Sequence, residues 1–506
     1  MKKTIFAFIA VIMLLSVVAT VSISATTSSE AEDISRSVTV SGTGYNSFGF
    51  LTDGNQNVYL TSAKNAVINI TGENGIGSLY IMFTLSPEEY VIEDIENGKT
   101  VSAGEYGFLH EYIDVSALFG YEPKNISIKF SSSVRMSEIY VFTKGETPSF
   151  VQKWQPPLED NTDLLICATH GDDDQLFFAG LMPYYAVYKD YRVQVAYLTD
   201  HRNLTEGRTH EMLNGLWAVG VTAYPVFGTF ADFRIDSLEG TYNHYKTLGT
   251  TRDDLLSFVT ELLRRFNPLV VAGHDFKGEY GHGMHQAYAD LLSEAITISG
   301  NAEKFPESAE KYGVWEVQKA YFHLYGENQI VMDFDTPQDC FDGLSAFQVS
   351  QKKGYPCHVS QQYTWFTQWL NGYSGEITKA TQIKDYNPCE YGLYFSSVGD
   401  DVNKNDMFEN IVTYGEQERI EQEKAEQSIA DELSRQEEQS RLQEQSVLDE
   451  QSRLNELSTE QSVQTQTSNI DENVVESPKQ IILIVLVCIA SVCVVTAFAV
   501  AAKKRK

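Results

Sequence analysis

The sequence predicts an all-β sandwich, then an α/β domain with a largely parallel, Rossmann-like sheet, then a helical stalk that leads to one transmembrane helix. Short segments of alternating apolar and polar residues occupy residues 36–148, and this period of two is typical of strands. Strand-like and helix-like segments alternate over residues 160–412, which indicates a parallel sheet covered by helices. Residues 481–502 carry no charge and are long enough to cross a bilayer as a helix.

The composition is that of a folded and strongly acidic protein. Of 506 residues, 42% are hydrophobic, and 38 Lys and Arg face 69 Asp and Glu, a formal net charge of −31. This hydrophobic content allows a large core and excludes wholesale disorder. Because nucleic acid and anionic membrane surfaces repel so acidic a chain, neither is an expected partner. Six cysteines are too few for a disulfide scaffold, and composition leaves the oligomeric state open.

The two ends of the chain predict a protein anchored in the cell membrane. Two lysines, an apolar run and small residues give residues 1–25 the order of a secretory signal peptide; an uncleaved anchor is the alternative. The apolar segment 481–502 is followed by the C-terminal KKRK, which favours a cytoplasmic C-terminus. Together they predict a single-pass protein whose N-terminal bulk is extracellular.

Residues 416–478 form the predicted stalk. They are rich in Glu, Gln and Ser, lack aromatic residues and carry a serine every six residues from 428 to 458. Six residues advance a helix by about 600°, which is about 120° short of two full turns. Successive leucines of the repeat therefore point in different directions and do not form a coiled-coil seam. The repeat places Glu three residues before Arg, as at Glu438 and Arg441, which favours a single solvated helix. A disordered tether of the same composition is the alternative.

The predicted β-sandwich begins at residue 36 and ends at residue 148. Turn signals such as Asp53-Gly54 separate its strands, and the last strands are similar to the end of galactose-binding-like jelly rolls. Two roles stay open for this domain, carbohydrate binding and a purely structural one. The expected strands are residues 37–41, 58–61, 66–71, 78–83, 126–130 and 138–142.

In the α/β region, histidines gather where strands end. Expected strands are 164–169, 193–199, 223–228 and 268–272; expected helices are 175–188, 205–219, 253–265 and 285–298. Ligands of such sheets bind at the carboxyl ends of the strands. Half of the ten histidines fall at these ends, namely His170, His201, His274, His282 and His285.

Carboxylates accompany the histidines. Asp172 and Asp173 follow His170, and acids in that position could simply cap a helix. His282 and His285 are three residues apart and share a helix face. Imidazoles together with carboxylates suit a divalent transition metal with an open coordination position.

Two motifs in this region resemble those of the PIG-L/LmbE-like N-deacetylases. Residues 165–180, LICATHGDDDQLFFAG, are similar to the family's strand, His-Pro-Asp-Asp-Glu and helix. Residues 270–287 are similar to its second motif, a strand followed by His-x-x-His, and residues 391–411 to the closing segment of long bacterial members. This chain departs from the first motif in having Gly171 for the usual Pro and Asp174 for the usual Glu.

The resemblance implies a role for each motif residue. His170, Asp173 and His285 match the zinc ligands of the family, and Fe²⁺ or Mn²⁺ would accept the same donors. Asp172 matches the general base, which takes a proton from water and delivers it to the leaving amine. His282 matches a second histidine that stabilises the oxyanion, as a cation, or assists the leaving amine.

Further residues are candidates for substrate binding. Arg208 matches a family arginine, although a helix-surface arginine is equally compatible with its position, and His201 lies on the same rim of the sheet. His274 is a candidate for supporting the metal ligands. Aromatic residues at 363, 365, 366 and 369 could stack on sugar rings, but their spacing also suits an ordinary core helix.

The resemblance therefore implies a zinc-dependent N-deacetylase, and the two ends of the chain predict that it works at the bacterial cell surface. Its expected substrate is an N-acetylated amino sugar or glycan of the N-acetylglucosamine type. The alternative is a non-catalytic carbohydrate-binding or adhesion protein with a deacetylase-like domain. The presence of Asp172 together with all three implied ligands favours the enzyme.

Overall fold

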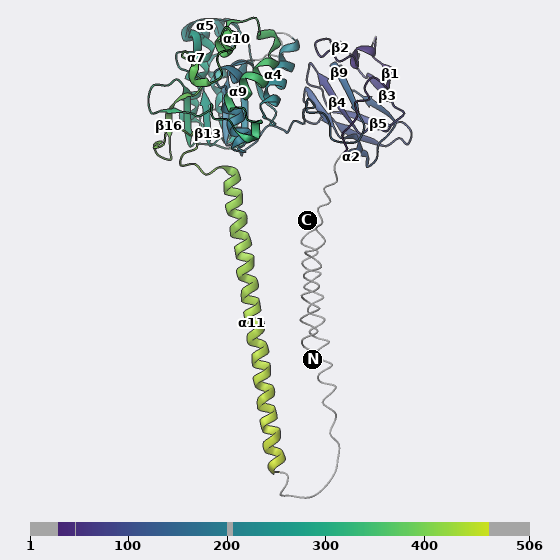
Figure 1. Cartoon of the computed structure of the whole chain (residues 1–506), viewed down its shortest axis with the longest axis vertical. Helices are drawn as coiled ribbons and strands as arrows, with labels where there is room; N and C mark the ends of the chain where they lie inside the picture. Colours follow the sequence, from purple (N-terminus) through teal and green to yellow (C-terminus); the bar gives the residue numbers. More distant parts are fainter. Residues whose placement is uncertain (1–28, 46, 200–205, 465–506) are drawn as a thin grey trace. The chain divides into compact units, whose positions relative to one another are not determined.

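A computed structural model describes residues 29–45, 47–199 and 206–464 of the chain (Figure 1). The predicted signal peptide, His201, residues 465–478 of the predicted stalk and the apolar segment 481–502 lie outside these residues. Among the helices that are described, none combines the length and apolarity needed to cross a membrane. The chain divides near residue 419 into two units.

The N-terminal region is a sandwich of two antiparallel sheets. One sheet has the order β1-β3-β8-β5-β6 and the other β2-β9-β4-β7. Apolar side chains of β3 and β8 point into the space between the sheets, where Ile68 pairs with Ile128 and Ile70 with Ile126. The strands are β1 Thr39–Thr43, β2 Leu60–Thr61, β3 Val67–Thr71, β4 Ser78–Phe83, β5 Tyr90–Asp94, β6 Thr100–Ala103, β7 His110–Ile113, β8 Asn125–Lys129 and β9 Arg135–Phe142; the short helices are η1 Gly49–Leu51 and α2 Val115–Phe119.

Three strands of the sandwich, β5, β6 and β7, were not predicted from the sequence. Strand β7 reads His-Glu-Tyr-Ile, and its polar residues His110 and Glu111 are buried. Such a segment lacks the apolar alternation that marks a strand. Its polar groups are satisfied by distant partners, for example Tyr90 Oη, which donates to Glu111 Oε2 at 2.7 Å.

The α/β domain contains a seven-stranded sheet of order β12-β11-β10-β13-β14-β16-β15. The first five strands are mutually parallel, and β16 runs antiparallel to both of its neighbours, β14 and β15. The predicted largely parallel sheet is thus confirmed. From β10 the chain proceeds outward to β11 and β12, then returns to place β13 on the other side of β10, so the strand order reverses between β10 and β13. The strands are β10 Leu164–Ala168, β11 Val193–Thr199, β12 Val226–Phe230, β13 Val270–Gly273, β14 Lys319–His323, β15 Gln329–Val331 and β16 Glu390–Ser396.

The helices of this domain follow the predicted alternation except at residues 175–188. There the expected single helix is wrong: α3 ends at Leu176, and a π-helix, η2, follows at Pro183–Tyr188. Gly180 separates them with a φ of +91°, where a Cβ would lie 2.7 Å from the Phe334 ring. The helices are α3 Asp173–Leu176, α4 Glu206–Ala218, α5 Leu238–Thr247, α6 Arg252–Phe266, α7 Gly283–Ile298, α8 Pro306–Tyr312, α9 Ala346–Val349 and α10 Trp365–Asn371, with short turns η4 Glu279–Gly281, η5 Asp339–Phe341, η6 Ser350–Gly354, η7 Tyr355–Cys357, η8 Val359–Gln361 and η9 Ala380–Gln382.

The stalk is helical over the part that the structure describes. Helix α11 runs from Tyr414 to Gln464, 51 residues, or about 75 Å at 1.5 Å per residue. From residue 420 to 458 its side chains are exposed, and the repeat pairs Arg435 with Glu432 at 3.4 Å. Leu442 is 63% exposed, so the leucines of the repeat form no packed seam here. Over residues 414–464 the structure therefore agrees with the predicted helix and not with the disordered tether.

A buried polar network joins the β-sandwich to the α/β domain. Gln152 Oε1 accepts from the indole N–H of Trp154, at 2.8 Å, and lies 2.7 Å from His110 Nδ1. Because indole only donates, this oxygen is an acceptor and His110 Nδ1 carries the proton. His110 Nε2 therefore accepts, and its partner at 2.6 Å is Nδ1 of His210 on α4. Two neutral histidines thus connect the domains.

This network predicts a loss of stability in acid. Burial lowers the pKa of His210 to about 4, below the 6.5 expected in the unfolded chain. As pH falls from about 6.5 to 4, the unfolded chain takes up the proton first, so the free energy of unfolding should fall, by about 3 kcal/mol for this group. His210→Asn keeps a donor but does not titrate. Urea unfolding at pH 7.5 and 5 should show a smaller pH effect in this variant than in the wild type; equal pH effects would contradict the prediction.

Candidate metal centre and active site

The predicted site residues come together at the reversal of strand order. Strand β10 is buried throughout, and His170 follows its carboxyl end by two residues. His285 lies in the first turn of α7, which begins at Gly283. A Cβ at Gly283 would lie 2.3 Å from Thr241 Oγ1 of α5, so glycine allows α7 to pack closely there. The sheet topology thus brings together two motifs more than a hundred residues apart.

Three donor atoms converge in this site, and they belong to the three residues expected as metal ligands. His170 Nδ1 lies 3.1 Å from Asp173 Oδ2 and 3.1 Å from His285 Nε2. His285 Nε2 lies 3.3 Å from Asp173 Oδ2. A tetrahedral zinc ion with ligands at 2.0–2.1 Å spaces its donors by about 3.3 Å. The spacing of these buried donors therefore fits a zinc ion.

A carboxylate holds the far nitrogen of each imidazole. His170 Nε2 lies 3.2 Å from Asp232 Oδ1, and His285 Nδ1 lies 2.7 Å from Glu279 Oε2. With a proton on each of these far nitrogens, the near nitrogens present lone pairs to each other and to Asp173. Such lone pairs repel each other unless a cation lies between them. Metal-bound histidines typically donate the N–H of the other ring nitrogen to a carboxylate or carbonyl, as these two histidines can do here. The donor set therefore fits a metal ion on chemical grounds as well as by distance.

The electrostatics of the site favour positive charge. Burial alone would lower the pKa of His170, but Asp173 and Asp232 raise it to about 10. Burial alone would raise the pKa of Asp173, but His285 and His170 hold it well below its ordinary value. A proton on His170 and a metal ion would therefore compete for the same position. Asp173 is ionised, because its pKa lies well below the ordinary value.

Glu279 connects the centre to two further histidines. Besides His285, it binds His274 Nδ1 at 2.9 Å and His323 Nδ1 at 2.7 Å, and it is fully buried. Burial alone would raise the pKa of Glu279, but His274 and the hydrogen bonds from all three histidines hold it well below its ordinary value. His274 Nε2 accepts from the Thr169 N–H, so His274 supports the centre, and His170 is the better third ligand.

Sequence inspection missed Glu279, Asp232 and His323. Glu279 lies within the second motif, between His274 and His282, and is the only glutamate there. Asp232 follows β12 by two residues and so lies on the rim where the histidines gather. These positions were signals that could have been used. His323 ends β14, a strand that was not predicted, and carried no such signal.

Glu279→Gln tests the support of the metal ligands. The amide keeps the size of the side chain but removes the charge that orients His285 and His274, so we expect metal affinity to fall by about 10- to 100-fold. Competition with a chelator would measure the affinity, and thermal unfolding would verify that the variant is folded. Exposed Glu303→Gln is the matched control. Equal affinities for Glu279→Gln and the wild type would contradict the prediction.

Asp172 lies beside the centre, paired with Arg208 of α4. Arg208 Nη2 is 3.0 Å from Asp172 Oδ1, and both side chains are about 9% exposed. Burial alone would lower the pKa of Arg208, but Asp172 and Glu211 raise it, so the guanidinium stays charged. Asp172 can therefore act as a proton acceptor whose position Arg208 fixes.

His282 is close to both histidine ligands, with ring centroids 4.9 Å from those of His170 and His285. Burial, together with the charges of these two rings, lowers the pKa of His282 to about 2. This lowered pKa favours a neutral ring over the expected cation. A neutral imidazole still offers one N–H donor.

A cavity of about 490 Å³ is lined by His170, Asp172, Asp173, Arg208 and His282. Tyr363, Phe366 and Tyr280 add aromatic surface to the cavity, and Ser360 and Gln361 add polar groups. Tyr363 is 86% exposed, so the core-helix alternative is wrong for this side chain. A cavity of this size is in the range of small-molecule sites.

The two departures from the family motif have structural explanations. A Cβ on Gly171 would lie 2.3 Å from the side chain of Met212 on α4, so glycine lets this helix pack on the loop. Asp174 is fully buried, and burial raises its pKa well above the ordinary value. The four cysteines among the described residues are all free thiols.

Comparison with known proteins agrees with this geometry. Residues 165–296 match the PIG-L family model, described as GlcNAc-PI de-N-acetylase. The matched segment lies within the α/β domain. This confirms the resemblance seen in the two motifs, because the matched segment contains both of them and every donor of the metal centre.

Two curated relatives of this chain are named as deacetylases. A 1D-myo-inositol 2-acetamido-2-deoxy-alpha-D-glucopyranoside deacetylase of Mycobacterium leprae is 24% identical over 190 residues, 33% of this chain and 61% of the relative. One from Catenulispora acidiphila is 26% identical over 140 residues, 27% and 42% of the two chains. This chain thus spans less than two thirds of either relative.

Among solved structures, N,N'-diacetylchitobiose deacetylase from Pyrococcus horikoshii aligns with 47% of this chain and 85% of its own. The identity is 16% and the TM-score 0.31, too low to support an inference about substrate.

Proposed function

We propose that this protein is a metal-dependent hydrolase that removes the N-acetyl group from an N-acetylated amino sugar of the N-acetylglucosamine type. The observation that carries the proposal is the convergence of His170, Asp173 and His285 beside Asp172 in an open cavity. The PIG-L match supports deacetylation as the reaction. Zinc is the proposed metal, and Fe²⁺ or Mn²⁺ would fit the same donors.

Each residue around the centre has its own role in amide hydrolysis. A metal held by His170, Asp173 and His285 would supply Lewis-acid chemistry, lowering the pKa of water and polarising a carbonyl. Asp172 takes the proton from the attacking water and gives it to the departing amine nitrogen. Arg208 holds Asp172 in place, and the N–H of His282 donates to the oxygen that gains negative charge.

We also propose that the hydrolase works at the cell surface. The signal-peptide pattern of residues 1–25 and the apolar segment 481–502 followed by KKRK support a single C-terminal anchor with the domains outside. The exposed helix α11 supports a spacer role for the stalk. Protease treatment of intact cells tests the location: the domains should be cleaved from the cells, and protection from protease would overturn this placement.

Acetate release tests the reaction. The full-length protein in detergent micelles, loaded with zinc, is incubated with N-acetylglucosamine, its oligomers and cell-wall fragments. Acetate that appears with zinc and disappears after metal is stripped supports the proposal. Sugar binding without acetate release from any substrate would instead indicate the non-catalytic carbohydrate-binding protein.

A further inference from the structure

A second cavity, of about 720 Å³, lies where the β-sandwich meets the α/β domain. Tyr80, Tyr140 and Phe150 line it from the sandwich side. Asn214 and Trp217 of α4, with Lys353 and Cys357, line it from the other side. No role in the proposed reaction uses this cavity.

The cavity has the surface that a sugar chain requires. Phe150 is 47% exposed, and its ring centroid lies 5.2 Å from that of Tyr140 and 6.4 Å from that of Tyr80. Phe150 and the partly exposed Tyr140 offer aromatic surface against which the apolar face of a pyranose can pack, whereas Tyr80 is buried. Lys353 and Asn214 on the opposite wall offer donors for hydroxyl and acetamide oxygens.

Two elements run from this cavity to the active site. On α4, Arg208 lines the active-site cavity and Trp217 the second one, about 14 Å apart at 1.5 Å per residue. Glu211 and Asn214 lie between them along the helix at steps of three residues, and each step falls about 60° short of a full turn, so the row winds around the helix axis. Alongside, Lys353 borders the second cavity and Ser360 the active site, and Ser360 Oγ donates to Glu211 Oε2 at 2.6 Å. Helix α4 and residues 353–361 therefore each contribute lining residues to both cavities.

We propose that the second cavity is a binding subsite for an extended glycan, one acetamido group of which occupies the active site. The inference rests on the proposed function and specifies its substrate class: an oligomer or polymer of N-acetylated sugars rather than a free monosaccharide. The β-sandwich then takes part in substrate binding by supplying the aromatic wall of the subsite.

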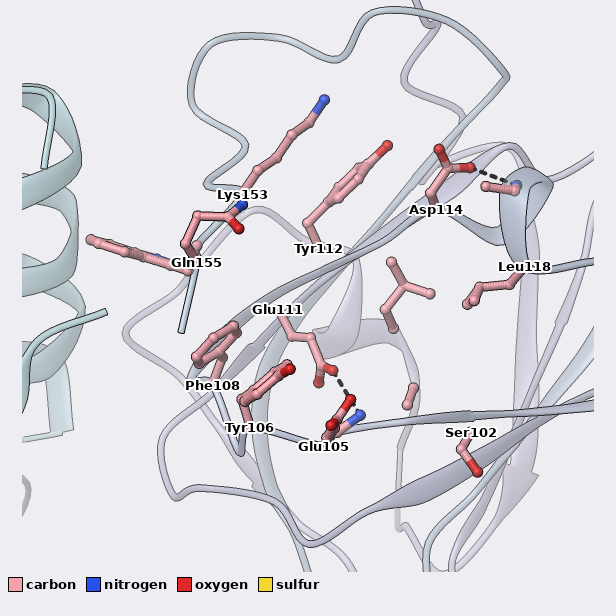
Figure 2. A pocket seen from close by; sticks show the side chains of 15 residues that line it. Ser102, Glu105, Tyr106, Phe108, Glu111, Tyr112, Asp114, Leu118, Lys153 and Gln155 are labelled. Carbon is pink, nitrogen blue, oxygen red and sulfur yellow. Dashed lines mark hydrogen bonds between the residues drawn. The ribbon is translucent and has the colours of Figure 1, made fainter. Parts of the chain in front are cut away.

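Another hollow of the β-sandwich provides a matched control. Figure 2 shows this cavity of about 490 Å³, with Tyr106 and Phe108 on one side and Lys153 beside Tyr112 on another. It shares no lining residue with the proposed subsite, and neither α4 nor residues 353–361 line it. Tyr106 is 56% exposed, so Tyr106→Ala removes an aromatic ring from the same domain without touching the proposed subsite.

The test compares short and long substrates. Full-length, zinc-loaded protein is assayed on N-acetylglucosamine and on its β-linked pentamer. We expect kcat/KM to be at least about tenfold higher for the pentamer. Phe150→Ala and Lys353→Ala, from opposite walls, should each raise KM for the pentamer by about tenfold and leave the monosaccharide unaffected, because they remove binding that only the long substrate makes. Tyr106→Ala should change neither.

A binding measurement separates this inference from the proposed function. Calorimetry with Asp172→Asn and the pentamer should give an affinity that Phe150→Ala lowers about tenfold, whether or not the wild type releases acetate. Acetate release without dependence on length, or equal losses in Phe150→Ala and Tyr106→Ala, would overturn the subsite and leave the deacetylase standing. Length-dependent binding without acetate release would keep the subsite and overturn the deacetylase. Absence of both would overturn both.

Discussion

Asp172→Asn should lower kcat for acetate release by about 10²- to 10⁴-fold, the usual worth of a general acid–base group. The amide has nearly the same shape as the carboxylate but cannot take the proton from water. It keeps an oxygen that can accept from Arg208 Nη2, now 3.0 Å from Asp172 Oδ1, so the cavity should keep its form. Asp172 is not one of the three converging donors, and the bound metal should remain.

The measurement pairs steady-state kinetics with metal content. Asp236→Asn is the matched control, because Asp236 also pairs with an arginine, Arg234 at 3.3 Å, but is exposed. Full metal content with lost turnover in Asp172→Asn, and normal values in Asp236→Asn, would support the assignment. Wild-type turnover in Asp172→Asn would show that another group takes the proton.

His285→Ala should weaken metal binding by more than the roughly 100-fold that loss of a supporting contact can cause. The substitution removes one of three donors. It also deprives the buried carboxylate of Glu279 of one of its two contacts at 2.7 Å. The protein should lose activity in proportion to its metal.

Chelator competition and elemental analysis measure this loss. His244→Ala is the control, since His244 is half-buried against Phe233, with ring centroids 4.2 Å apart, and lies outside the metal centre. Thermal unfolding of both variants distinguishes metal loss from unfolding. Undiminished metal affinity in folded His285→Ala would move the ligand assignment to other donors.

The sequence by itself determined the central part of the site. His170 and Asp173 follow a buried strand, and His285 opens a helix after another strand. Since parallel strands bring their carboxyl ends to one edge, strand identity was enough to place these side chains together. The period of two in β3 and β8 and the hexad of the stalk are likewise local patterns, which the chain displays without reference to its fold.

Only the tertiary structure decided which groups support that centre. Glu279 meets His323 from 44 residues away, and His110 meets His210 across 100 residues. A polar residue in a short buried strand has no periodic signature, and its pKa and hydrogen bonds depend on partners that folding alone brings near. The break at Gly180 depends in the same way on the Phe334 ring. Local pattern therefore specified the donors of the metal centre, whereas long-range packing specified the carboxylates that orient them, the lowered pKa of His282 and the cavity between the domains.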